Sequence, residues 1–199
     1  MILAQKLKKA LIFGISGQDG TYLSKFLLTK NYEIHGTTRN LKKDTLQNLH
    51  IVKIFNNVKI HIIDSTKLDV VKNIIKELKP DEIYNLSGQS SVSKSFLTPQ
   101  DTFYSITKVS LNILESIKSL SFKCRFYNAS SSECFGDTGN VSSNEKTNFN
   151  PCSPYGVAKS SAFWLTKNYR DAYNLFVCSG ILFNHESPLR PENFVTKKI

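Results

Sequence analysis

Short apolar segments alternate along the chain with longer stretches whose apolar residues recur at helical spacing. The short segments, which we interpret as β-strands, are residues 10–13, 33–38, 58–63, 82–86, 125–129 and 176–182. The stretches with helical periodicity are residues 21–29, 68–78, 101–120 and 154–173. Repeated strand–helix–strand units predict a parallel sheet with helices on both faces. The fold class is therefore α/β, a Rossmann-type doubly wound parallel sheet.

One long segment without either periodicity lies at residues 136–153, where Gly, Asp, Ser, Asn and Pro are frequent. A loop of this length inside a compact domain is usually functional. No apolar run reaches the roughly 18 residues that a membrane span needs. The lysine-containing start and the short apolar run after it lack the cleavage pattern of a signal peptide, so a cytoplasmic location is our default expectation.

A glycine-rich turn directly follows the first predicted strand and opens a helix. Its residues are Gly14, Ile15, Ser16, Gly17, Gln18, Asp19 and Gly20. In a Rossmann turn the first glycine permits the tight turn, the second lets the backbone approach a pyrophosphate, and the third permits close helix–strand packing. The exposed N–H groups and the dipole at the helix start favour an anion. Glycines at this spacing can also form a simple turn, but the strand–turn–helix context favours a dinucleotide site.

The ends of the next strands indicate which dinucleotide binds. No acidic residue follows the second strand, where NAD sites usually carry one, and Arg39 is placed to meet the 2′-phosphate of NADP. A plain surface arginine is the alternative interpretation. Asp64 after the third strand could accept a hydrogen bond from the adenine amino group. The fourth strand leads into small residues beside the cofactor, namely Leu86, Ser87, Gly88, Gln89 and Ser90.

The strongest local motif is Ser153-Pro154-Tyr155-Gly156-Val157-Ala158-Lys159. Ser153 can cap a helix and Pro154 suits its first position. Tyr155 and Lys159 are four residues apart and so share a helix face. An ammonium and a bound nicotinamide would lower the pKa of the phenol, which could then take a proton from a sugar hydroxyl. Such a pair is also common on helix surfaces, and it is the upstream glycine turn that favours catalysis.

A second polar group lies where the fifth predicted strand ends. Ligands bind at the carboxyl ends of strands in such sheets, and Ser131 could hydrogen-bond the reacting oxygen there. Glu133 supplies a carboxylate two residues later. It is either a solvated acid at a loop start or the base of a reaction that abstracts a carbon-bound proton.

Net charge and cysteine spacing bear on two further questions, whether the chain binds nucleic acid and whether it binds a metal. The formal net charge is +10, but the lysines are scattered, so a phosphate-bearing nucleotide accounts for the charge as well as a nucleic acid does. The cysteines are Cys124, Cys134, Cys152 and Cys178. They lack paired spacing or a nearby histidine for zinc, so we predict free thiols and no metal site.

These residues resemble the extended short-chain dehydrogenase/reductase superfamily and, within it, the GDP-mannose 4,6-dehydratase family. Four stretches carry the resemblance: residues 14–23, 128–136, 153–159 and 180–199, the last containing Asn-His-Glu-Ser-Pro. Family members commonly have Thr at Ser131, His at Ser91 and a Leu-Tyr-like pair at Cys134-Phe135. The hydroxyl at Ser131 is kept, and the other two departures leave the sugar nucleotide less certain than the fold.

The resemblance implies a set of roles. Ser131, Glu133 and Tyr155 would form the active-site trio, and Lys159, Ser65, His185 and Arg190 would join the glycine turn in binding NADP. Tyr155 would take the C4 hydroxyl proton of GDP-mannose as hydride leaves C4. Glu133 would then remove the C5 proton, water would leave from C6, and the hydride would return to C6 while a proton is added at C5, so that no net redox results. Family members are dimers or tetramers.

The resemblance spans only about the N-terminal half of a family member. We therefore expect residues 1–182 to be an NADP-binding domain and residues 183–199 to begin a truncated substrate-binding lobe. The chain alone should bind NADP weakly and turn over slowly or not at all. Two other hypotheses stay open: another sugar-nucleotide epimerase, reductase or dehydratase, and a non-catalytic NADP-binding protein. Nucleic-acid binding rests on net charge alone.

Overall fold

Six parallel strands form one twisted sheet in the computed structural model, which describes residues 6–41, 43–121 and 123–191. The strands are β1 (Lys8–Phe13), β2 (Tyr32–Thr38), β3 (Val58–Ile62), β4 (Glu82–Asn85), β5 (Arg125–Ser131) and β6 (Val177–Leu182). Their order across the sheet is β3-β2-β1-β4-β5-β6. The order reverses between β1 and β4, so the carboxyl ends of these two strands flank the crevice in which such sheets bind ligands. The predicted fold class is confirmed.

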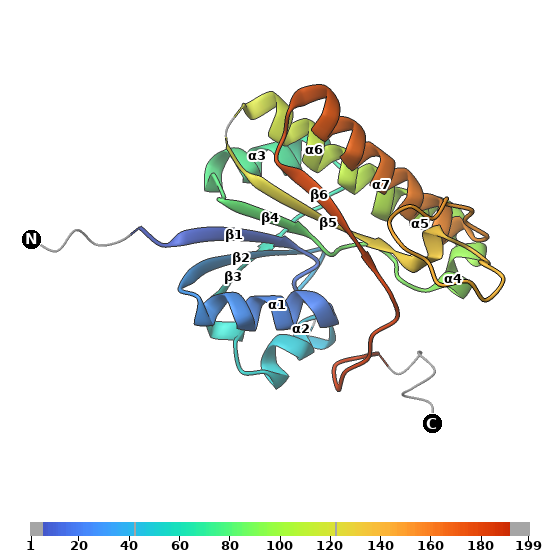
Figure 1. The fold of residues 1–199 in the computed structure, drawn as a ribbon. Coiled ribbons are helices and arrows are strands. Elements are labelled where there is room, and N and C mark those ends of the chain that lie inside the picture. The colour runs from blue at the N-terminus through green and yellow to red at the C-terminus, as the bar shows by residue number, and fades with distance from the viewer. Residues whose placement is uncertain (1–5, 42, 122, 192–199) are drawn as a thin grey trace, which may run out of the picture.

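Helices cover both faces of the sheet (Figure 1). Helices α1 (Gln18–Thr29) and α2 (Lys43–Ile51) lie on one face, and α3 (Leu68–Leu78), α6 (Val109–Leu120) and α7 (Pro154–Tyr173) lie on the other. Two short helices, α4 (Val92–Leu97) and α5 (Pro99–Phe103), lie near the carboxyl ends of the strands. Within the described ranges, no helix has the length and apolar character that crossing a bilayer requires.

Each face of the sheet has its own apolar core, as alternation along the strands requires. Leu11 and Phe13 point towards α3 and α6, where Ile113 and Ile117 are almost completely buried. Ala10 and Ile12, one residue out of phase, pack towards α1 and α2. A third, smaller cluster of Ile106, Tyr155, Ala158 and Ala162 lies between α7 and the segment before α6. This third cluster buries the tyrosine that the sequence singled out.

Two helices are absent from the sequence-based prediction. Helix α2 is marked only by Leu46 and Leu49, which are three residues apart and buried, so its apolar stripe spans a single turn. Helix α4 has six residues, most of them exposed, and it begins where the Ser91 hydroxyl accepts the Lys94 N–H at 3.3 Å. Elements this short contain too little periodicity for a pattern to reveal.

The predicted helix over residues 101–120 is present but is not uniform. It consists of α5, a π-helical segment at Tyr104–Lys108, and α6. The Thr107 hydroxyl in the π-helical segment donates to the Ala158 carbonyl of α7 at 3.0 Å. Such π-helical segments often occur at functional sites, and this one contacts α7 one residue before Lys159.

The long loop over residues 136–153 contains no helix or strand, as predicted. Phe149 anchors it by edge-to-face contacts with Phe135, Phe163 and Trp164, with ring centroids 5.4, 4.8 and 5.8 Å away. Aromatic pairs at these separations add stability beyond their buried area. The loop is therefore held against the first half of α7, next to Tyr155.

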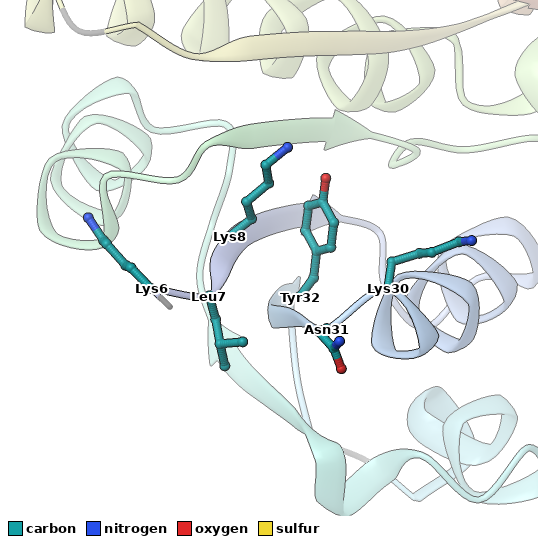
Figure 2. Close-up of a pocket in the computed structure, with 6 residues that line it drawn as sticks. All are labelled: Lys6, Leu7, Lys8, Lys30, Asn31 and Tyr32. Carbon is teal, nitrogen blue, oxygen red and sulfur yellow. The ribbon is translucent and has the colours of Figure 1, made fainter. Parts of the chain in front are cut away.

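A cavity of about 310 Å³ lies at the opposite end of the sheet, where β1 begins and α1 leads into β2. Lys6, Lys8 and Lys30 line it together with Leu7, Asn31 and Tyr32 (Figure 2). Lys6 and Lys30 point in opposite directions in this view, so their ammonium groups do not converge on one ligand. The candidate site is instead at the carboxyl ends of the strands.

Candidate active site

The glycine turn brings α1 very close to the end of β1. Gly14 has φ of +84°, which L side chains rarely adopt, and a Cβ on it would lie 2.8 Å from the Leu86 carbonyl oxygen. A Cβ on Gly20 would lie 2.3 Å from the Gly14 carbonyl oxygen. At Gly17, in contrast, the nearest atom would be 3.4 Å away. The first and third glycines are thus required for packing, whereas the second leaves open space above the turn.

That open space is bounded by the N-terminus of α1. Gly17 is the N-cap residue of this helix, and no side chain caps it. The N–H groups of a helix start that lacks a side-chain cap are available to an anion. On one side, the Asn48 side chain of α2 donates to the Ser16 carbonyl at 3.1 Å and braces the turn. The sequence pattern does not indicate Asn48, because the apolar stripe of α2 spans a single turn.

On the other side, the turn is connected to the segment that follows β6. The Ser187 hydroxyl donates to Gln18 Oε1 at 2.8 Å, and Gln18 Nε2 donates to the His185 carbonyl at 3.3 Å. His185 Nε2 lies 2.8 Å from Asp19 Oδ1. We call Gln18, Asp19, His185 and Ser187 the Gln18 cluster. Hydrogen bonds to the Phe183 carbonyl and to Asp19 raise the pKa of His185.

A groove of about 350 Å³ opens beside this cluster. It is lined by Asp19, Leu23, Tyr84, Leu86, Tyr127, Leu182 and His185. These residues come from α1, from the ends of the central strands and from the segment after β6, so the groove lies at the edge where the predicted cofactor residues gather. Its apolar side chains could cover a flat ring, and Asp19 and His185 add a few polar groups, as in many cofactor sites.

The segment after β4 packs against the π-helical segment. A Cβ on Gly88 would lie 2.8 Å from Ile106, and the Gln89 N–H donates to the Ser105 hydroxyl at 3.2 Å. The Gln89 side chain is itself engaged, since its Nε2 donates to the Ser91 carbonyl at 2.8 Å and to the Thr102 hydroxyl at 3.1 Å. The side chain of Gln89 thus holds the conformation of this segment. The backbone of Leu86 contacts the glycine turn. Ser90 is exposed.

The residues predicted to meet the adenosine half lie at the ends of β2 and β3. Arg39 is exposed directly after β2. Asp64 Oδ1 accepts the backbone N–H of Thr66 at 3.0 Å and its hydroxyl at 2.6 Å, which lowers the Asp64 pKa. The Ser65 carbonyl accepts a hydrogen bond from Asn112 of α6 at 2.9 Å. Asn112 is a second supporting residue that the sequence pattern did not indicate.

The predicted catalytic residues meet where β5 ends and α7 begins. Tyr155 and Lys159 lie one turn apart on the buried face of α7, and Lys159 Nζ is 5.8 Å from the centre of the Tyr155 ring. Lys159 Nζ also donates to the Ala129 carbonyl of β5 at 2.8 Å. The Ser131 side chain lies near enough to the Tyr155 phenol to lower its pKa. These contacts come from two elements joined only through the long loop.

The electrostatics of this pair differ from the expectation. Burial raises the pKa of Tyr155, although the Ser131 hydroxyl and the positive charge of Arg190 both lower it. Burial also lowers the pKa of Lys159 to about 8. Desolvation thus outweighs the neighbouring protein groups at Tyr155, and the lowering of its pKa by an ammonium together with a nicotinamide stays a prediction.

Glu133 lies in a short 3₁₀ turn, Ser132–Cys134, immediately after β5. Its N–H donates to the Ser131 hydroxyl at 3.3 Å, and its negative charge raises the pKa of Tyr155. A Cβ on Gly156 would lie 2.7 Å from the Glu133 carbonyl oxygen, so this turn packs directly on the start of α7. Ser153 caps α7 as predicted, accepting the Gly156 N–H at 3.0 Å. All four cysteines are free, and Cys134 is fully buried beside Ser130.

A doubly wound sheet with this glycine turn and this Tyr–Lys pair defines the extended short-chain dehydrogenase/reductase class. The chain belongs to the GDP-mannose 4,6-dehydratase family, whose model it matches over residues 11–199. It is 45% identical over 200 residues to GDP-mannose 4,6-dehydratase of Yersinia enterocolitica, covering 97% of this chain and 54% of that protein. It is 46% identical over 199 residues to that of Vibrio cholerae serotype O1, covering 96% and 53%. The chain thus spans about half the length of these curated relatives.

A solved structure with the same fold is UDP-glucuronic acid 4-epimerase from Bacillus cereus in complex with UDP-glucuronic acid and NAD. The TM-score is 0.84 at 21% sequence identity, and the match covers 95% of this chain and 60% of that one. At this identity the likeness establishes the fold.

Substitution by alanine should lower the free energy of unfolding more at Gly20, where a Cβ would meet backbone atoms, than at Gly17. Gly20→Ala puts a Cβ against backbone atoms of Gly14, and we expect the free energy of unfolding to fall by about 1–3 kcal/mol or more. Gly17→Ala meets no close contact at an allowed φ, so its loss should stay below about 1 kcal/mol. Urea denaturation of both variants measures the difference. Equal losses would contradict our assignment of the open space to Gly17.

The buried ammonium of Lys159 should make stability depend on alkaline pH. The folded-state pKa of about 8 lies below the ordinary value of 10.5, so between these values the unfolded chain holds the extra proton. Stability attributable to Lys159 therefore rises with pH across this window and is constant below it. Lys159→Met should be more stable than the parent at pH 7.5, and this advantage should shrink by up to about 3 kcal/mol towards pH 10.5.

Denaturant midpoints of both proteins across the window test this. Lys167→Met, which removes an exposed lysine of the same helix, is the control for the exchange of lysine for methionine. A constant advantage of Lys159→Met would show that Lys159 titrates normally.

Proposed function

We propose that this chain is the nucleotide-binding part of a GDP-mannose 4,6-dehydratase, which converts GDP-mannose to GDP-4-keto-6-deoxymannose with NADP as an internally recycled cofactor. Residues 1–182 would bind NADP, and residues 183–199 would begin the substrate-binding lobe. The observation that carries the proposal is the set Ser131, Glu133, Tyr155 and Lys159, gathered at one strand edge in a member of this family. This is a hydro-lyase activity of the complete protein.

The residues present suit a nicotinamide dinucleotide. The uncapped start of α1 and the open space at Gly17 suit a pyrophosphate, and the epimerase from Bacillus cereus binds NAD on the same fold. Arg39 favours NADP over NAD, because its guanidinium can pair with a 2′-phosphate where an acidic residue would repel it. His185 and Arg190 would face the same site from the segment after β6. When bound, the cofactor accepts a hydride from the sugar and returns it.

The protein's own groups supply the proton transfers. Tyr155 would remove the proton of the C4 hydroxyl, with Ser131 holding the same oxygen through its hydroxyl. Lys159, with its pKa of about 8, can hold a proton or release it near neutral pH. A C4 ketone acidifies the C5 proton, which the Glu133 carboxylate would take before water leaves from C6. The last step makes Glu133 the residue that favours a dehydratase over an epimerase, because an epimerase needs no such base.

Glu133→Gln should abolish dehydration while leaving NADP binding unchanged, because the amide keeps the size of the carboxylate but cannot accept the C5 proton. The protein encoded by the longest open reading frame that contains these residues is incubated with GDP-mannose. The 4-keto-6-deoxy product is measured by its absorbance in alkali. Glu145→Gln, in the exposed part of the loop, serves as the matched control and should retain activity. Unchanged activity of Glu133→Gln would remove Glu133 from the mechanism, and an epimerised product would favour an epimerase.

Arg39→Ala should raise the Kd for NADPH about tenfold, equivalent to about 1.4 kcal/mol, and should leave the Kd for NADH nearly unchanged. Fluorescence titration of the 199-residue chain provides both constants. Arg170→Ala, which removes an exposed arginine of α7 paired with Asp171, is the control. If Arg39→Ala raised the Kd for NADPH and the Kd for NADH by the same factor, Arg39 would not be the residue that recognises the 2′-phosphate.

A further inference from the structure

The Gln18 cluster joins two parts of the chain that are far apart in sequence. Its hydrogen bonds span 166 to 169 residues, from the first turn of α1 to the segment that follows β6. In Figure 1 this segment leaves the sheet after β6 and runs on the side of α1. These contacts connect the two ends of the nucleotide-binding fold.

Gln18 is the centre of the cluster. Its side-chain carbonyl accepts from the Ser187 hydroxyl, and its amide nitrogen donates to the His185 carbonyl and to Asp19 Oδ1. Gln18 is only 9% exposed. Bonds of a buried amide matter more than exposed ones, because an unmade bond leaves a desolvated polar group without a partner. The His185–Asp19 pair is more exposed and so contributes less.

The segment itself has a defined turn conformation. The Leu189 N–H donates to the Ser187 hydroxyl at 3.1 Å, and the Arg190 N–H donates to the Ser187 carbonyl at 3.0 Å. Leu189 is buried, with 5% of its surface exposed. Ser187 thus connects Gln18 to the turn that carries Arg190. The turn therefore lies beside the phosphate-binding turn, and the positive charge of Arg190 lowers the pKa of Tyr155.

We propose that Gln18 is a positioning residue: through Ser187 and His185 it fixes the segment of residues 183–191 over the phosphate-binding turn, and so holds Arg190 beside the dinucleotide. The cofactor part of this inference rests on the proposed function. The structural part does not, because it concerns contacts within the protein alone.

Gln18→Met tests the structural part, since methionine keeps the length of the side chain and removes its hydrogen bonds. Hydrogen–deuterium exchange of the chain without cofactor should show about tenfold faster exchange in the peptide covering residues 183–191. Asn48→Ala is the matched control, because it removes a brace of the same turn from the other side and does not contact the segment. Exchange in that peptide should be unchanged in Asn48→Ala. An unchanged rate in Gln18→Met would overturn the proposal.

Ser187→Ala extends the test to the partner. If Gln18 acts through Ser187, Gln18→Met should accelerate exchange less in the Ser187→Ala background than in the parent, whatever Ser187→Ala does alone by removing the hydrogen bond from the Leu189 N–H. Additive effects of the two substitutions would overturn the proposed route.

The cofactor part is tested by the Kd for NADPH. Gln18→Met should weaken binding about tenfold, and NADPH should slow exchange of residues 183–191 in the parent but much less in the variant. If the parent binds no nicotinamide dinucleotide, the proposed function fails while the exchange result still decides the role of Gln18. If NADPH binds equally well to parent and variant, Gln18 holds the segment but does not position it for the cofactor, and the proposal is wrong.

Discussion

The structure depends on the close approach of α1 to the end of β1. This approach is possible only because Gly14 and Gly20 lack a Cβ. A side chain at either position would collide with backbone atoms at this separation of helix and strand. Once α1 starts there, its uncapped N-terminus lies at the crevice between β1 and β4, and its first turn presents Gln18 and Asp19 to the segment that follows β6. The phosphate-binding site and the contacts between α1 and the segment after β6 therefore both depend on the absence of a side chain at Gly14 and Gly20.

The position of the reactive tyrosine depends on a second set of contacts, at the start of α7. The Ser153 cap and Pro154 fix where α7 begins, and Gly156 lets the turn containing Glu133 pack against it. Lys159 is then buried against the Ala129 carbonyl with a reduced affinity for its proton. Burial therefore disfavours the charged form of both side chains, raising the pKa of Tyr155 and lowering that of Lys159. A bound cation above the phenol, such as an oxidised nicotinamide, would shift that balance towards phenolate.

Much of this arrangement could be predicted from the sequence. The strands, the long helices and the glycine turn follow from periodicity and local motifs, and the pairing of Tyr155 with Lys159 follows from their helical spacing. The supporting contacts could not be predicted: Asn48 lies on a helix with a one-turn apolar stripe, and Asn112 and Thr107 act through hydrogen bonds to carbonyls of distant segments. The raised pKa of Tyr155 was also unpredictable, because it comes from burial by residues of other elements. Spacing along a helix indicates proximity but not desolvation.

The strand order has a consequence for the way the chain folds during synthesis. Strand β1 lies at the centre of the sheet, yet one of its neighbours, β4, begins only at Glu82. While the ribosome extends the chain, β1, β2 and β3 can pair first, and the second edge of β1 stays unpaired until β4 emerges. An exposed parallel edge rich in Leu, Ile and Phe attracts other strands, so this interval is when the nascent protein is most exposed to aggregation.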